Sequence, residues 1–197
     1  MKTLEDYIAF DIEFNQYEGA YQIIQVSAVR FTDGKEVDHY DSYVYTDKPL
    51  KSFINGLTGI TQDKIQNAPQ LEHVLIEFKT FVGDRPLIGY NAKKSDLPIL
   101  LENGLDLEEQ YAVDVFDEAF ERRPSDLHGI KNLQLHTVAE FLGVAGKSHD
   151  SLEDARMTAL VYEQFLEFDQ GRTLLEEQEE FSTKPFGSLD LSGFFDE

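Results

Sequence analysis

The chain has 197 residues, of which 41% are hydrophobic, so it can bury a sizeable core as one large domain or as a domain with an appendage. Its net charge of −21 argues against a general affinity for duplex nucleic acid, but it does not exclude a short or single-stranded polyanion gripped locally through metal ions. The sequence has no cysteine, no apolar run of about 20 residues and no signal-peptide pattern after Met1. We therefore expect a soluble cytoplasmic protein without disulfides, a thiolate metal site or a membrane partner.

The first predicted element is a strand that carries two acidic side chains. Residues 7–10 form an unbroken apolar run, which is typical of a strand buried on both faces. Residues two apart in a strand point to the same side, so Asp11 and Glu13 would present their carboxylates together. Two like charges held that close are unfavourable unless a divalent cation or a similar group neutralises them. Taken alone in so acidic a chain, the pair is better explained as ordinary surface acids.

Two more strands are predicted directly after the first. Residues 21–31 alternate between two faces, one of which carries Ile23, Gln25, Ser27, Val29 and Phe31. Asp33-Gly34 is typical of a hairpin turn, and residues 37–45 are rich in tyrosine and valine. Short turns between consecutive strands predict an antiparallel meander.

The remainder of the chain alternates between helical and strand patterns. We predict a loop at 57–61, a short helix from the N-cap Thr61 to about Ala68, and a strand at 87–90. Further elements are predicted as a helix at 71–82, a helix from the N-cap Ser95 to Gly104, a strand at 111–116, and helices at 117–122, 135–142 and 151–168. This order favours an α/β domain over residues 1–168 with a mixed sheet. Residues 169–197 are expected to form an acidic helix, at 174–181, and a tail outside that domain.

Three further polar residues lie at the ends of predicted elements. Asp96 lies in the first turn of a helix after a short buried strand, where the helix dipole alone would favour an acid. His149 precedes the helix that begins at Ser151, and Asp154 lies in its first turn. Ser151 with Asp154 resembles a capping box, and an isolated loop histidine is usually inert. Each residue therefore has an ordinary structural explanation when it is considered separately.

The joint pattern favours a site. The chain supplies Asp11, Glu13, Asp96 and Asp154, with His149, all at the ends of buried elements, where sheet topologies place active sites. Four carboxylates without a thiolate suit Mg²⁺ or Mn²⁺ better than zinc. A histidine that titrates near neutrality is a natural general base beside such ions.

The order and spacing of these residues resemble a known family, the DnaQ-like DEDDh 3′–5′ exonucleases, over roughly residues 5–168. The matching segments are Phe10-Asp11-Ile12-Glu13, Leu57-Thr58-Gly59-Ile60-Thr61, Tyr90-Asn91 through Asp96-Leu97-Pro98-Ile99-Leu100, and His149-Asp150-Ser151-Leu152-Glu153-Asp154-Ala155. The resemblance implies an RNase H-like fold, that is, a mixed five-stranded sheet with flanking helices. Three departures from the family pattern, at Phe14-Asn15, Tyr90 and Ser95, would change the substrate pocket and not the metal site.

The resemblance also implies a mechanism. Asp11, Glu13, Asp96 and Asp154 would hold two ions, Mg²⁺ or Mn²⁺, and His149 would take the proton from an attacking water. The product would be a nucleoside 5′-monophosphate released from the 3′ end of DNA, in proofreading or repair. Substrate contacts would come from Ile12, Phe14, Leu57, Tyr90 and Asn91, some by stacking on the terminal base.

Two other functions remain open at this stage. One is an RNA-directed 3′ exonuclease similar to RNase T or oligoribonuclease, because the sequence does not decide between DNA and RNA. The other is a nuclease-like binding module in a replication complex, which is disfavoured because all five signature positions are filled. Residues 188–195 faintly resemble the peptide by which bacterial replication proteins bind the sliding clamp, so we consider a clamp or DNA polymerase as a partner of the tail.

Overall fold

The protein folds around one twisted five-stranded sheet. The computed structural model of the chain describes residues 1–144 and 150–183. The strands are β1 (Asp6–Tyr17), β2 (Ala20–Thr32), β3 (Lys35–Tyr43), β4 (Leu87–Gly89) and β5 (Tyr111–Asp114), and their order across the sheet is β3-β2-β1-β4-β5. β1, β2 and β3 are antiparallel, whereas β4 and β5 run parallel to β1. This mixed sheet with flanking helices is the arrangement that the sequence predicted.

The antiparallel half is joined by two tight hairpins. The turn at Asp33-Gly34 has φ values of 50° and 73°, and the turn at Glu18-Gly19 has 50° and 88°. Two consecutive residues with positive φ match the right-handed twist of the flanking strands, and aspartate and glycine reach this region more easily than most residues. The predicted hairpin at Asp33-Gly34 is therefore confirmed.

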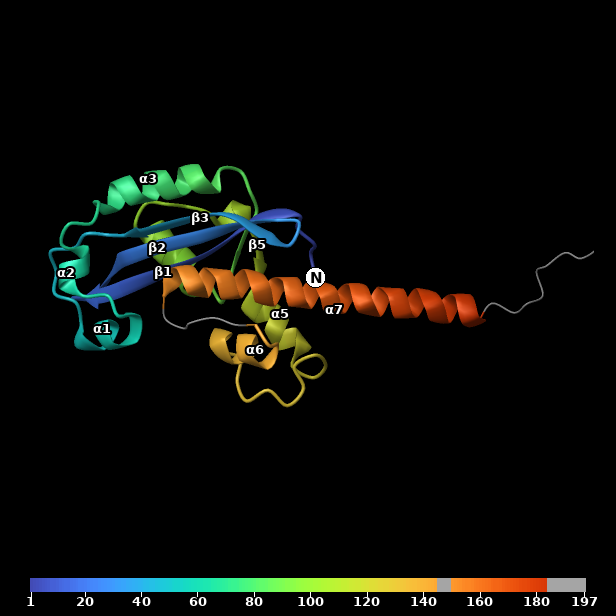
Figure 1. Ribbon diagram of the computed structural model, residues 1–197. Coiled ribbons are helices and arrows are strands. Elements are labelled where there is room, and N and C mark those ends of the chain that lie inside the picture. Colours follow the sequence, from blue (N-terminus) through green and yellow to red (C-terminus); the bar gives the residue numbers. More distant parts are fainter. Residues whose placement is uncertain (145–149, 184–197) are drawn as a thin grey trace, which may run out of the picture.

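Helices cover both faces of the sheet (Figure 1). They are α1 (Ser52–Thr58), α2 (Gln62–Ile65), α3 (Leu71–Val82), α4 (Asp96–Glu102), α5 (Val115–Arg122), α6 (Leu135–Phe141) and α7 (Ser151–Thr183), with a short 3₁₀ turn at Glu108–Gln110. One core cluster joins the sheet to α3 and α4, and a second joins the opposite face to α5, α6 and α7. The sheet is thus the middle layer of three.

The alternation of β1 decides which layer each of its side chains meets. Ile8, Phe10 and Ile12 pack into the cluster on the α3 and α4 side. Tyr7 and Ala9 pack into the cluster on the α7 side. Because the side-chain period of a strand is two, Asp11 and Glu13 continue the row of Tyr7 and Ala9 and face the start of α7.

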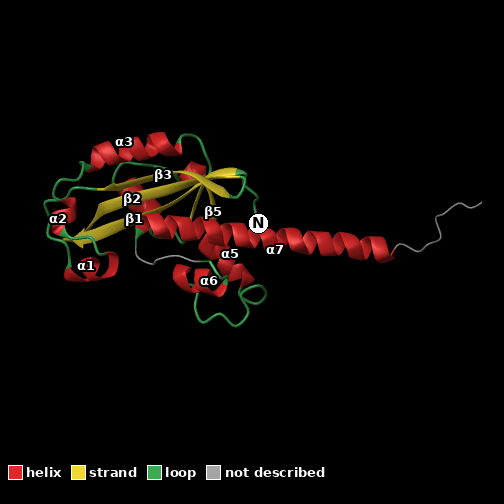
Figure 2. Ribbon diagram, viewed as in Figure 1, coloured by secondary structure: helices red, strands yellow, loops and turns green. Residues whose placement is uncertain are grey.

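Several boundaries differ from those predicted from sequence; Figure 2 shows the helices, strands and loops of the structure. Leu57 and Thr58, which we expected in a loop, form the last turn of α1, and the helix ends at Gly59 with a φ of 69°. α2 ends at Ile65 and not at Ala68, although Thr61 caps it as predicted. The strand expected at 111–116 stops at Asp114, which is the N-cap of α5.

The largest difference concerns the last helix. We expected one helix to end near Phe168 and a separate one at 174–181, but α7 runs without interruption from Ser151 to Thr183. The helix continues because residues 169–173 contain no proline and because Gly171, although a weak helix former, does not terminate it. The domain boundary at residue 168 stays a prediction. Within residues 1–144 and 150–183, no helix, α7 included, is apolar enough over a sufficient length to cross a membrane.

Candidate active site

The site begins with the acidic pair, which lies in the middle of β1 and not at the end of a strand as predicted, because β1 continues to Tyr17. Asp11 pairs across the sheet with Ser27 of β2, and Glu13 pairs with Gln25. The pairing register shifts immediately after this pair, between Glu13 and Phe14, where Ile24 of β2 is skipped in the pairing with β1, an irregularity of the kind seen at a β-bulge. Bulges break the regular alternation and turn side chains, and they are common beside active sites. The strand therefore presents Asp11 and Glu13 on one face and then changes its register.

The first turn of α7 brings a third carboxylate to this pair. Ser151 is fully buried, and its hydroxyl donates a hydrogen bond to the carbonyl oxygen of Asp11 at 2.8 Å. This bond ties the helix start to β1 and carries Asp154 over the acidic pair. The predicted capping box is wrong in its details, because the carboxylate of Asp150 caps the helix by accepting from the N–H groups of Leu152, at 3.1 Å, and Glu153, at 3.3 Å. Ser151 is used for the tether and not for the cap.

The three carboxylates converge closely enough to share a cation. One oxygen each from Asp11, Glu13 and Asp154 lie within 4.8 Å of one another. Carboxylate oxygens are the donors that Mg²⁺ and Mn²⁺ prefer in proteins, and the sequence has no cysteine to compete with them. The donor set of the site therefore fits these ions.

Asp96 lies outside that three-residue group but is fixed against it. Its Oδ1 accepts a hydrogen bond at 3.1 Å from the N–H of Ile12, the residue between Asp11 and Glu13. The hydroxyl of Ser95 lies within hydrogen-bond distance of Oδ2 of Asp96 and, at 3.1 Å, of the carbonyl of Asn91, and these two acceptors share its one proton. Ser95 occupies the N-cap position of α4 as predicted, but its side chain makes no capping bond, because it serves Asp96 instead. Asp96 is 5% exposed.

The electrostatic state of the cluster supports cation binding. Burial, followed by the charges of Asp96, Glu13 and Asp154, holds the pKa of Asp11 well above its usual range. Burial and the charges of Asp154, Asp96 and Asp150 raise the pKa of Glu13 to about 8. Burial raises the pKa of Asp96 to about 6, although hydrogen bonds from Ser95 and Ile12 oppose the rise. These carboxyl groups are expensive to ionise together, and a bound divalent cation would remove that cost.

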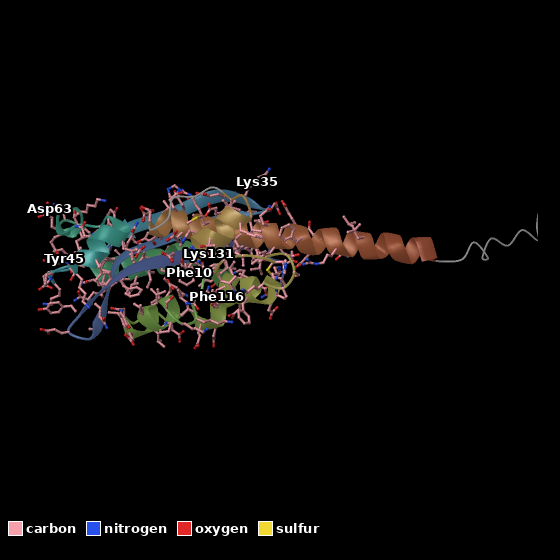
Figure 3. All side chains as sticks on the ribbon, turned by 90° about the horizontal axis from the view of Figure 1, so that it is seen from below. Phe10, Lys35, Tyr45, Asp63, Phe116 and Lys131 are labelled. Atoms are coloured by element: carbon pink, nitrogen blue, oxygen red, sulfur yellow. The ribbon has the colours of Figure 1, made fainter. Side chains whose placement is uncertain are left out.

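The predicted substrate residues on β1 and α1 lie near one end of the sheet. The side chain of Ile12 lies in the core on the α3 side, and its N–H donates a hydrogen bond to Asp96. Phe14 is half-buried and packs edge-on against Tyr21, with ring centroids 5.3 Å apart. Leu57 is 47% exposed on α1. Together with α2, which contains the labelled Asp63, α1 lies at the end of the molecule where β1 finishes (Figures 1 and 3).

Tyr90 and Asn91 lie on the other side of the cluster. Both line a cavity of about 370 Å³ whose wall also includes Asp154 and Phe116. The hydroxyl of Tyr90 donates to the carbonyl of Leu133 at 2.7 Å, and its ring meets Phe116 edge-on at 5.8 Å. Tyr90 thus forms a rigid wall of this cavity.

Sequence reasoning placed two polar residues on one face of the second strand but gave them no role beside the acidic pair. Gln25 and Ser27 are buried on β2 and donate hydrogen bonds to Asp41 of β3, at 2.9 and 2.7 Å. They interrupt an otherwise apolar strand face, and that interruption directly opposite an Asp-x-Glu pair was the available sequence signal. The predicted general base His149 lies outside the described residues, so its role stays a prediction.

A comparison with protein families decides the identity of this fold and site. The RNase_T family model, described as Exonuclease, matches residues 8–162 and so covers most of the chain. The chain belongs to the exonuclease family. It is a DnaQ-like member of the DEDDh type, as its motifs predicted. Exonucleases of this type depend on divalent metal ions, which agrees with the carboxylate cluster of this member.

Curated relatives of this exonuclease-family chain include very long bacterial proteins. DNA polymerase III PolC-type of Clostridium perfringens (strain 13 / Type A) is 30% identical over 157 residues, which are 79% of this chain and 11% of that protein. The PolC-type protein of Thermotoga maritima is 32% identical over 165 residues, 80% of this chain and 12% of that protein. The chain therefore spans about a tenth of the length of these relatives.

Solved structures of other nucleases share the fold. The nuclease domain of 3′hExo, a DEDDh family member bound to rAMP, aligns with a TM-score of 0.66 and 21% identity over 83% of this chain and 92% of that one. E. coli Exonuclease I in complex with a dT13 oligonucleotide aligns with a TM-score of 0.70 and 16% identity, over 87% of this chain and 43% of that one. The predicted RNase H-like fold is therefore confirmed.

Proposed function

We propose that this protein is a divalent-metal-dependent 3′–5′ exonuclease that removes nucleoside 5′-monophosphates from the 3′ ends of single-stranded DNA. The observation that carries the proposal is the convergence of Asp11, Glu13 and Asp154 within 4.8 Å, with Asp96 hydrogen-bonded to the peptide between the first two. Such a set has no evident structural use, because carboxylates that are grouped and partly withdrawn from water destabilise a fold without a cation. The geometry therefore favours catalysis over a structural or binding role.

Each residue has a defined task in this proposal. Asp11, Glu13, Asp96 and Asp154 would hold two Mg²⁺ or Mn²⁺ ions, and these would supply Lewis-acid stabilisation of the charge that develops on the phosphate. His149 would accept the proton of the attacking water as general base. The bond from Ser151 to Asp11 and the bond from Ile12 to Asp96 keep the carboxylates in place, so that little reorganisation is needed during the reaction.

The substrate is proposed to lie between α1 and the cavity walled by Tyr90. Leu57 is exposed on α1, and Phe53, one helical turn earlier on the same face, is 59% exposed. These two apolar side chains could stack beside the last bases of a single strand, with Phe14, Ile12 and Asn91 contributing closer contacts. Stacking is compatible with the net charge of −21, because it does not need a broad basic surface.

The proposed preference for DNA rests on the relatives. PolC-type proteins are named as DNA polymerase III, so a DNA-directed, proofreading or repair role in the cytoplasm is the first expectation for this chain. An association with a DNA polymerase would fit the same context. Binding of a sliding clamp by residues 188–195, which lie outside the described residues, is a separate proposal. It is tested by a clamp pull-down with a variant truncated after residue 183, and unchanged clamp binding would remove it.

A paired digestion assay tests the proposed function. Single-stranded DNA and RNA of one sequence, labelled at the 5′ end, are incubated with the protein in Mg²⁺, in Mn²⁺ or in EDTA. We expect a metal-dependent ladder that shortens from the 3′ end, with DNA digested faster than RNA. Faster digestion of RNA would replace the substrate proposal by the RNase T-like or oligoribonuclease-like alternative.

Two variants make the assay specific to the site. Asp11→Asn should abolish digestion, because it removes a ligand charge at the centre of the cluster. Asp33→Asn is the matched control, because Asp33 is exposed in a turn with a φ of 50°, a conformation that asparagine tolerates. A digestion ladder that survives in Asp11→Asn would contradict the proposed site. Metal binding without digestion of either strand would favour a binding module.

A further inference from the structure

We propose that Asp114, which lies outside the DEDDh motifs, is a positioning residue that holds the turn from which Asp96 enters the active site. The proposal rests on the proposed function, because it assigns Asp114 a role in forming the metal site. It depends on a continuous series of hydrogen bonds from Asp114 through Asn91 and Ser95 to Asp96. Asp114 itself would contact neither metal nor substrate.

The carboxylate of Asp114 accepts hydrogen bonds from three backbone N–H groups. Asp114 is 4% exposed, at the end of β5. Its Oδ1 accepts from the N–H of Asn91 at 2.7 Å and from the N–H of Phe116 at 3.1 Å, and its Oδ2 accepts from the N–H of Lys93 at 3.3 Å. Capping α5 requires only the bond to Phe116. The hydrogen bonds from Asn91 and Lys93 are not needed for the cap, and they connect Asp114 to the turn after β4.

Asn91 is the centre of that turn. It has a φ of 60°, a left-handed conformation that asparagine adopts more readily than most residues. Asp114 holds its N–H, while its carbonyl accepts from the N–H of Lys94 at 3.1 Å and from the hydroxyl of Ser95 at 3.1 Å. The orientation of the Asn91 backbone is thus fixed from both sides.

Ser95 connects the turn at Asn91 to the carboxylate of Asp96. Its hydroxyl contacts both the carbonyl of Asn91 and Oδ2 of Asp96. The other oxygen of Asp96 meets the N–H of Ile12 between the two acids of β1. If the Asn91 backbone rotated, Ser95 would lose the contact with the turn that helps to fix its hydroxyl beside Asp96.

Tight packing leaves the turn no easy alternative position. A Cβ at Gly89, the last residue of β4, would lie 2.6 Å from the Cβ of Ala92 in the turn, and 3.2 Å from the hydroxyl of Tyr111 on β5. The turn therefore lies directly on the strand ends, where Asp114 can reach two of its N–H groups. A carboxylate is suited to this task because its two oxygens can accept several hydrogen bonds at once.

The test uses the purified full-length chain and two substitutions of Asp114. Asp114→Ser keeps a side chain that caps α5 well but is too short to bridge to the turn. Asp114→Asn keeps one oxygen that can accept from both Asn91 and Phe116. Mn²⁺ binding without nucleic acid is followed by the electron paramagnetic resonance of free Mn²⁺. Digestion is then measured against the concentration of Mg²⁺.

We expect Asp114→Ser to weaken Mn²⁺ binding on the order of tenfold and Asp114→Asn to weaken it less. In Asp114→Ser the Mg²⁺ concentration for half-maximal digestion should rise, while the rate at saturating Mg²⁺ falls much less. The control is Phe120→Gly, which weakens α5 at a side chain that is 61% exposed and should leave Mn²⁺ binding unchanged. Wild-type Mn²⁺ affinity in a folded Asp114→Ser protein would overturn the proposal, as would an equal loss in Phe120→Gly.

A second variant covers the case in which Asp114→Ser does not fold. Ser95→Ala breaks the last step of the series without touching Asp114, and it should weaken Mn²⁺ binding in the same direction. Unchanged Mn²⁺ binding in Ser95→Ala would also overturn the proposal. Failure of the proposed function gives a different result, because a wild-type protein that binds Mn²⁺ but digests neither DNA nor RNA contradicts the exonuclease and leaves the Asp114 test intact.

Discussion

Replacing Glu13 by glutamine should stabilise the metal-free protein at alkaline pH, even though it removes a metal ligand. The pKa of Glu13 is raised from an ordinary 4.5 to about 8 by burial and by the charges of Asp154, Asp96 and Asp150. Because the folded state holds this proton more strongly than the unfolded chain, the stability that the proton supplies falls as pH rises from about 4.5 and is lost above about 8. Glutamine does not ionise, so the Glu13→Gln protein should keep its free energy of unfolding as the pH rises through about 8.

The size of the effect follows from the pKa difference. At ~1.4 kcal/mol per pH unit, the interval from 4.5 to about 8 corresponds to an upper bound of ~5 kcal/mol. Glu13 is partly exposed, and solvent relaxation reduces the expected gain at pH 9 to ~2–3 kcal/mol. For a chain of this size, that gain corresponds to a rise in Tm of roughly 5–10 °C.

The assay is thermal and denaturant unfolding in EDTA at pH 5 and pH 9. Wild type and Glu13→Gln should differ little at pH 5, where Glu13 is protonated in the folded protein, and should separate at pH 9. The control is Glu109→Gln, because Glu109 is exposed and the substitution changes the net charge equally. Saturating Mg²⁺ should raise the Tm of wild type at pH 9 and that of Glu13→Gln much less. Equal unfolding of wild type and Glu13→Gln at pH 9 in EDTA would refute this account of the cluster.

Three further substitutions probe the supports of the site. Ser151→Ala removes the hydrogen bond to the Asp11 carbonyl and should cost ~1–2 kcal/mol in urea unfolding and weaken Mn²⁺ binding, and an unchanged Mn²⁺ affinity would argue against the tether. The buried side chain of Asn15 donates to the carbonyl of Pro49 and accepts from the N–H of Lys51, just before α1, and Asn15→Ala removes both hydrogen bonds. It should raise KM for single-stranded DNA several-fold at unchanged Mn²⁺ affinity, and a loss of metal binding instead would show that α1 is not its target. His149→Ala should lower kcat by 10²-fold or more at unchanged Mn²⁺ affinity, and a wild-type kcat would contradict its role as general base.

The local periodicity of the sequence was sufficient to predict most of the fold. Alternation in β1 placed Asp11 and Glu13 on one face, and the structure has them there because a strand offers side chains only two directions. The hairpin at Asp33-Gly34 and the cap at Thr61 were also predictable, because they depend on the conformations that a few neighbouring residues prefer. The helix end expected near Phe168 was wrong because nothing in the local sequence stops the helix there.

The candidate ligands could be named from sequence because the order of the motifs restricts them strongly. Their supports could not, because these bonds join residues that are distant in the chain. Ile12 and Asp96 are separated by 84 positions, and Asp11 and Ser151 by 140. Asp114 had no distinguishing feature in the sequence, where it lay inside the strand predicted at 111–116. A side chain's hydrogen-bond partners depend on which elements the packing brings together, and local pattern does not encode this.

The sequence by itself therefore determined the types of most elements, the shared face of Asp11 and Glu13 and the five residues proposed for chemistry. Only the tertiary structure decided that Ser151 tethers a helix and does not cap it, that Asp96 docks on the peptide of Ile12, and that Asp114 spans two segments. The physical reason is that secondary structure follows from interactions between near neighbours. A site of converging carboxylates forms only when the packing of a sheet between two helical layers has fixed the distances between residues of β1 and the first turns of α4 and α7.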